Sequence, residues 1–99
     1  MACVIVEMRN DDRPTDEELE REARALDASL AKRGGHWERS YLSADGTKMV
    51  CEFEAQDAQS VRDALAEAKV AYEMAWQAER WRIEDQRAPA KREPETARA

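Results

Sequence analysis

Residues 40–54, SYLSADGTKMVCEFE, have the pattern of two extended segments joined by a tight turn. The Asp45-Gly46 pair between them is the strongest short-range signal for a β-hairpin, because both residues tolerate the positive backbone angles of such turns. The flanking segments contain the β-branched and aromatic residues that favour strands. We therefore predict strands over residues 36–42 and 48–54, and this hairpin guides the interpretation of the rest of the chain.

Two further elements are predicted before the hairpin. Residues 3–8, CVIVEM, are short and β-branched, which is typical of a strand. Thr15 then provides a helix N-cap, and Glu18 completes a capping box. Apolar residues follow at helical spacing, namely Leu19, Ala23, Leu26 and Leu30. The Gly34-Gly35 pair ends this helix, because glycine readily adopts the left-handed conformation found at helix C-termini.

After the hairpin, Asp57 caps a second helix with one apolar face, formed by Val61, Leu65 and Ala68. Two interpretations are open beyond Lys69. Propensity alone allows one long helix over residues 57–82. Alternatively, the helix ends near Lys69, and residues 76–83, WQAERWRI, form a fourth strand. We favour the strand, because the three strands already predicted leave a sheet edge that needs a partner.

The resulting order, β-α-β-β-α-β, predicts an α+β protein with the ferredoxin-like fold, in which two helices cover one face of a four-stranded antiparallel sheet. We expect one domain over residues 1–83. Residues 84–99 lack apolar periodicity and hold two of the three prolines, so we predict a flexible charged tail. The second sheet face is left bare, and in so small a domain such a face is polar, forms the floor of a pocket or is covered by another subunit. We expect a homodimer.

Composition excludes several classes of partner. The chain has 99 residues and a formal charge of −6, whereas nucleic-acid binding needs a basic face. No apolar stretch approaches the roughly 20 residues that span a bilayer, and the N-terminus does not resemble a secretion signal. Cys3 and Cys51 form no CxxC motif. We therefore predict a cytoplasmic protein with reduced thiols, without nucleic acid or membrane as partners.

Alternation along the hairpin divides its side chains between two faces. With an even loop, Arg39 lies opposite Glu52, and Ser40 lies opposite Cys51. The more apolar set is expected beneath the helices and comprises His36, Glu38, Ser40, Leu42, Met49, Cys51 and Phe53. The bare face would then carry Trp37, Arg39, Tyr41, Val50, Glu52 and Glu54.

Residues 37–64, WERSYLSADGTKMVCEFEAQDAQSVRDA, carry a specific resemblance. They resemble a small ferredoxin-like family of actinobacterial proteins with a nickel-binding member, in which a W-x-R-S-Y strand leads to an S-x-D-G turn, a strand ending in C-x-Y/F-E-A and a D-A-x-x-V-R helix. The start, VIVEMRNDDRPTDEEL, is similar to the V-E-R start and T-x-E-E-L helix of that family. The resemblance covers about residues 3–83, and it implies the fold, a homodimer and binding of nickel or a similar divalent metal.

Under the metal hypothesis, Cys51 and His36 supply thiolate and imidazole ligands, which suit late first-row ions. For Cys51 alone we favour a different interpretation, as a small core residue, because that is the usual place of a free cysteine. Two departures weaken the inheritance of metal binding. This chain has Leu65 where the family often carries a histidine, and it has Glu38 and Glu52 where the family often carries apolar residues.

The alternative is a cofactor-independent enzyme of cyclase or isomerase type, acting on a small organic molecule, as in secondary metabolism. Its acid or base candidates are Glu7, Glu52 and Glu54, and Arg39 or Tyr41 would bind an anion or oxyanion. Apolar pocket walls would come from Trp37, Tyr41, Trp76 and Trp81. A simpler interpretation pairs Arg39 with Glu52 within a dimer interface. No known nucleophile motif is present, so the sequence leaves the question of enzymatic activity undecided.

Overall fold

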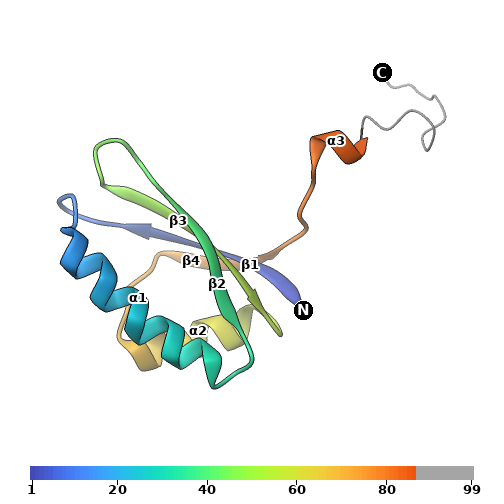
Figure 1. Cartoon of the computed structure of the whole chain (residues 1–99), viewed down its shortest axis with the longest axis horizontal. Coiled ribbons are helices and arrows are strands. Elements are labelled where there is room, and N and C mark those ends of the chain that lie inside the picture. Colours follow the sequence, from blue (N-terminus) through green and yellow to red (C-terminus); the bar gives the residue numbers. More distant parts are fainter. Residues whose placement is uncertain (87–99) are drawn as a thin grey trace.

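The computed structural model describes residues 1–86 and confirms the predicted ferredoxin-like architecture (Figure 1). The elements are β1 (Ala2–Arg9), α1 (Asp16–Ala31), β2 (His36–Leu42), β3 (Lys48–Ala55), α2 (Ala58–Ala68), β4 (Met74–Ala78) and the short α3 (Ile83–Gln86). The strands form one antiparallel sheet in the order β2-β3-β1-β4, and α1 and α2 cover one of its faces. The predicted domain boundary falls within α3. Most of the predicted tail, residues 87–99, lies outside the described residues, so the tail stays a prediction.

The core lies between the sheet and the two long helices. β1 and β3 pair along their whole length, from Ala2 opposite Ala55 to Arg9 opposite Lys48, so every second side chain of both strands points toward the helices. Phe53 is the largest fully buried side chain of this core. The other buried apolar residues are Val4, Val6, Met8, Leu26, Leu30, Met49, Cys51, Ala55, Val61, Ala64, Leu65, Val70 and Ala75.

Local signals set the start and end of α1 as predicted. The Thr15 side chain accepts a hydrogen bond from the Glu18 backbone at 3.1 Å, and the Glu18 carboxylate accepts one from the Thr15 backbone at 2.8 Å. This capping box satisfies two amides that the helix leaves without partners. At the other end, Gly34 adopts a φ of 73°, which turns the chain toward β2.

The hairpin has the predicted register over most of its length, with Arg39 opposite Glu52 and Ser40 opposite Cys51. A β-bulge between Trp37 and Arg39 shifts the register of the β2 residues that precede it. Because a bulge inserts one extra residue, it reverses the alternation of all residues beyond it.

The predicted faces at the start of β2 are therefore wrong. Trp37 lies opposite Phe53 on the helix-covered face, where the two rings pack with centroids 5.3 Å apart. Its indole N–H donates to the Ser40 hydroxyl at 2.8 Å. His36 lies opposite Glu54 on the other face of the sheet, and the Glu38 carboxylate contacts its imidazole there. The prediction from alternation puts His36 and Glu38 beneath the helices and Trp37 on the bare face, which is the reverse of this arrangement.

The fourth strand exists, but its predicted extent, residues 76–83, is wrong. β4 begins two residues earlier, at Met74, and ends at Ala78, which lies opposite Cys3 of β1. The strand stops there because antiparallel pairing has reached the N-terminal end of β1 and almost no partner remains. No helix within residues 1–86 has both the length and the apolar character needed to cross a membrane.

The left-handed conformation of Lys69, with φ of 60° and ψ of 41°, separates α2 from β4. Val70 closes the helix by donating its backbone N–H to the Leu65 carbonyl at 2.9 Å. The chain then leaves the helix axis and returns to the sheet. This turn excludes the single long helix over residues 57–82.

Replacing Lys69 by glycine tests the strain at this turn. Lys69→Gly is expected to raise the free energy of unfolding by about 1 kcal/mol, because a β-carbon in this conformation crowds the following carbonyl. Lys69→Ala is the matched control and keeps the strain, so it should stay within about 0.5 kcal/mol of the parent. Urea unfolding followed by circular dichroism measures both, and a glycine variant no more stable than the alanine variant would contradict the prediction.

Candidate functional site

The sheet face away from α1 and α2, here called the open face, has two chemically different halves. The apolar half is built by residues on all four strands, namely Ile5, Tyr41, Val50, Met74 and Trp76, and it surrounds one charged residue, Glu7, which lies between Val50 and Met74. Tyr41 is 61% exposed, Met74 51% and Trp76 43%. The charged half lies toward the other end of the sheet and comprises Cys3, His36, Glu38, Arg39, Glu52 and Glu54, together with Arg80.

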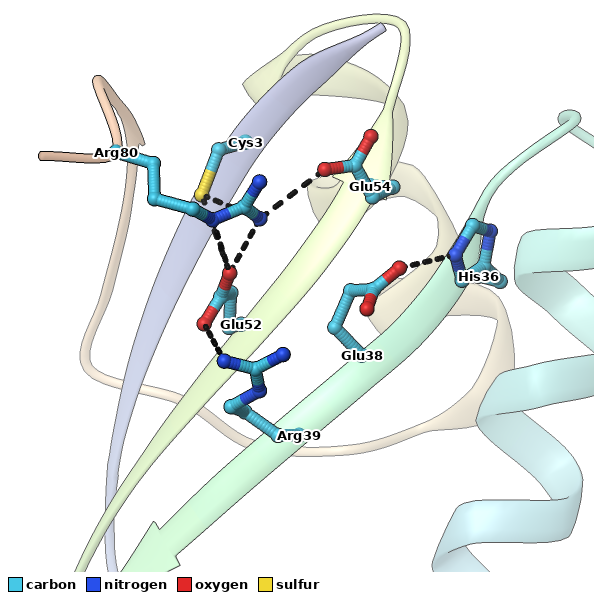
Figure 2. Close-up of polar contacts among 7 residues, drawn as sticks. All are labelled: Cys3, His36, Glu38, Arg39, Glu52, Glu54 and Arg80. Atoms are coloured by element: carbon cyan, nitrogen blue, oxygen red, sulfur yellow. Dashed lines mark hydrogen bonds and ion pairs between the residues drawn. The ribbon is translucent and has the colours of Figure 1, made fainter. Parts of the chain in front are cut away.

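Arg80 follows β4 and organises the charged half (Figure 2). Its Nε donates to the Glu52 carboxylate at 2.9 Å, and its Nη2 contacts Glu52 and also donates to Glu54 at 3.1 Å. Arg39 approaches the other Glu52 oxygen from β2 at 3.8 Å. Hydrogen bonds to Glu52 and then Glu54 raise the pKa of the Arg80 guanidinium above its usual range, so it stays charged.

The two glutamates need these cations because they are poorly hydrated. The Glu52 side chain is only 12% exposed and that of Glu54 only 22%. A carboxylate removed from water is destabilised unless a cation and hydrogen bonds replace the lost hydration. Arg80 supplies both, and the predicted pairing of Arg39 with Glu52 is present as a longer contact.

Arg80 is not among the site residues predicted from the sequence. The predicted strand over residues 76–83 conceals that the chain turns across the sheet after Ala78. A signal was present, however. Glu52 and Glu54 project from the same strand face, and Arg39 alone cannot neutralise both carboxylates.

Cys3 lies on the open face beside this cluster, and the sequence analysis gave it no role. Its sulfur is 3.9 Å from the Glu52 carboxylate and 3.8 Å from Arg80 Nη2. Burial raises the pKa of the Cys3 thiol, while the nearby Arg80 charge acts in the opposite direction. The thiol is therefore held mainly in its protonated form at neutral pH.

His36 and Glu38 form an imidazole–carboxylate pair at the edge strand β2 (Figure 2). The His36 side chain is 60% exposed and that of Glu38 is 29% exposed. The bulge creates this pair on the open face, because it turns His36 away from the core. The arrangement combines a nitrogen and an oxygen donor at a position that solvent and ions reach.

Cys51 occupies a different environment. It is fully buried and belongs to the core beneath the helices. Burial raises the pKa of the Cys51 thiol to about 11, although a hydrogen bond with Ser40 opposes the shift. The predicted metal ligands Cys51 and His36 therefore lie on opposite faces of the sheet, and the structure does not bring them together.

Within residues 1–86, no group of three or more histidine, cysteine, aspartate or glutamate side chains is arranged to hold a metal ion. Leu65, at the position where the family often carries a histidine, is fully buried in the core. Within residues 1–86, a single copy of the protein thus offers the exposed His36–Glu38 pair but no complete set of metal ligands.

The catalytic candidates all lie on the open face. Arg39, Glu52 and Glu54 come together in the charged half, whereas Glu7 and Tyr41 lie in the apolar half. Glu7 lies opposite Val50, and its carboxylate accepts a hydrogen bond from the Trp76 indole N–H at 2.9 Å, toward β4 and away from Glu52. A cleft of about 410 Å³ lies elsewhere, between α1 and the loop before it, and none of these five residues lines it.

Comparison with known proteins identifies the family. A family model described as "Nickel responsive protein SCO4226-like" matches residues 5–77. The chain belongs to this SCO4226-like family. The match ends within β4, so Arg80 lies just beyond it.

A solved structure supports the fold assignment. SCO4226 from Streptomyces coelicolor A3(2) matches with a TM-score of 0.70, covering 78% of this chain and 95% of that one, at 17% sequence identity. At this identity the likeness shows the fold alone. No curated protein matches the chain.

Thiol labelling tests the placement of Cys51. In a Cys3→Ala background, native Cys51 should react slowly with a small disulfide reagent at neutral pH, because the thiol is buried and protonated. The same protein unfolded in urea provides the fast control. Cys51→Ala should lower the free energy of unfolding by about 1 kcal/mol, close to the loss of one methylene-sized buried group. Labelling in the native state at the rate of the unfolded control would place the thiol in solvent.

Proposed function

We propose that this member of the SCO4226-like family is a cytoplasmic homodimer that binds a divalent transition metal such as nickel. The observation that carries the proposal is the open face, which combines an exposed apolar half with the exposed His36–Glu38 pair. The apolar half supports the dimer and the pair supports the metal. Both cysteines are unpaired, as expected in a reducing compartment.

The dimer is supported by how the apolar side chains are arranged. Tyr41 lies opposite Val50 across β2 and β3, and Ile5 lies opposite Trp76 across β1 and β4. These pairs extend over all four strands, with the Glu7 carboxylate between Val50 and Met74. Monomeric proteins rarely expose large apolar side chains in such a group, and a second copy would bury them.

Metal binding is supported by the chemistry of the donors. Imidazole nitrogen together with carboxylate oxygen suits late first-row divalent ions. His36 and Glu38 would hold the ion, and Cys51 is left out because its sulfur is buried on the opposite face. Since one described chain lacks a third ligand, we expect the remaining ligands from a second copy or from water. A ligand set divided between two copies would couple metal binding to dimerisation.

The enzyme alternative receives less support. Two of its three acid or base candidates, Glu52 and Glu54, share Arg80, and the third, Glu7, is engaged by Trp76. A base must be able to reach the proton of a substrate, and these contacts occupy the carboxylates.

Placing a charge in the apolar half should break the dimer. Val50 is 36% exposed and lies opposite Glu7, so Val50→Glu is expected to fold while it places a second carboxylate beside Glu7 in the interface. Sedimentation velocity at micromolar concentration should show a dimer for the parent and a monomer for this variant. Ala66→Glu, at an exposed position of α2, is the matched control and should remain dimeric. A parent with the mass of a single chain would contradict the dimer.

Nickel binding should depend on the imidazole. Isothermal titration of the metal-free protein with Ni²⁺ is expected to give a binding heat, and His36→Ala should weaken the affinity at least about tenfold through loss of a ligand. Cys51→Ala should bind within about twofold of the parent, because the buried thiol takes no part. Heat no greater than dilution, with nickel and with cobalt, would end the metal proposal. Equal weakening by both substitutions would restore the predicted Cys51–His36 pair.

A further inference from the structure

Residues 79–86 form a C-terminal arm that leaves the sheet after β4 and ends in α3 (Figure 1). Beyond Arg80 the arm extends away from the sheet and the two long helices. Two of its side chains are large and apolar. Trp81 is 65% exposed and Ile83 is 57% exposed. Ordered apolar side chains of this size on a projecting segment indicate a surface that is buried on association.

Arg80 fixes the base of the arm at the charged half of its own open face. The guanidinium binds Glu52 and Glu54 of β3, next to Cys3 at the start of β1. The apolar half reaches its far end at Met74, four residues along β4 from Ala78, or about 13 Å at the usual rise of a strand. The anchored arm is directed away from that region, so Trp81 and Ile83 remain uncovered by their own chain.

We propose that the arm of each copy packs Trp81 and Ile83 against the apolar half of a second copy. This inference rests on the proposed homodimer and names the segment that completes its interface. Each chain carries both an arm and an apolar half, so a twofold axis produces the same contact twice and closes the assembly. The second copy thereby buries the apolar half with its arm.

The chemistry of both surfaces favours a second copy over an unrelated partner. Trp81 and Ile83 are uncharged, and so are the five side chains of the apolar half. Glu7 lies among them, between Val50 and Met74, and its carboxylate accepts a hydrogen bond from the Trp76 indole. The two large apolar side chains of the arm and the exposed apolar side chains of the open face occur on the same chain, so two copies can cover each other's.

The arm lies beyond the segment that matches the family model, which ends at residue 77. Its anchoring residues, however, lie within the matched segment, at Glu52 and Glu54 of β3. The ion pairs fix Arg80 at the base of the arm before association, which reduces the conformational entropy lost when the arm docks.

Sedimentation velocity over a concentration series tests the contribution of the arm. The double variant Trp81→Ala, Ile83→Ala should weaken dimerisation at least about tenfold, since it removes two large side chains from the interface. Glu79→Ala, an exposed polar position on the same arm, is the matched control and should stay within about twofold of the parent. A double variant with the affinity of the parent would overturn the arm exchange and leave the homodimer standing.

Photo-crosslinking identifies the surface on which the arm docks. Trp81 is replaced by the photoreactive residue p-benzoylphenylalanine, and the irradiated protein is separated under denaturing conditions and mapped by mass spectrometry. The expected product is a covalent dimer joined at the strand segments of the apolar half, near Tyr41, Val50 or Met74. Crosslinks confined to a single chain would overturn the proposal. A parent that is monomeric at every concentration would overturn both this inference and the proposed homodimer.

Discussion

The pairing of β1 with β3 is the constraint on which the rest of the structure depends. These two central strands are in register over their full length, and one face of the pair packs under both long helices. Alternation then assigns every neighbouring side chain to the opposite face. Burial of Phe53 and Cys51 on one face thus places Glu52 and Glu54 on the other. The character of the open face follows from how the core is packed.

The charged half shows how this constraint is accommodated. Two carboxylates of low exposure on one strand are destabilised by desolvation and mutual repulsion, and Arg80 relieves both. Arg80 comes from a segment beyond the family match. Its ion pairs with Glu52 and Glu54 connect this segment to the sheet, in addition to the covalent chain. The exposed imidazole of His36 lies outside this network and keeps its own carboxylate partner, Glu38. The ion-pair network and the proposed metal ligands thus use separate groups on the same face.

Most of the fold could be predicted from short-range signals, whereas the site depended on two long-range effects. The Asp45-Gly46 turn and the Thr15 capping box act within a few residues, so the sequence displays them directly. The bulge at Glu38 has no such signal, because an exposed polar residue fits either alternation. The end of β4 depends on where β1 begins, far away in the sequence. The bulge places His36 on the open face, and the early end of β4 allows Arg80 to cross that face. His36 and Cys51, the predicted metal ligands, therefore lie on opposite faces of the sheet.

The bulge also has an evolutionary consequence. It shifts the alternation of side chains in β2 by one residue. Trp37 therefore lies under the helices and His36 lies on the open face. Loss of a single codon at Glu38 would remove the carboxylate and the bulge together, and it would leave Trp37 opposite Phe53 and His36 opposite Glu54. The core contact of the indole would then remain, while the imidazole would lose its carboxylate partner. Proteins with this fold can thus gain or lose an oxygen donor beside the imidazole through an insertion or deletion, while the indole and the imidazole keep their faces.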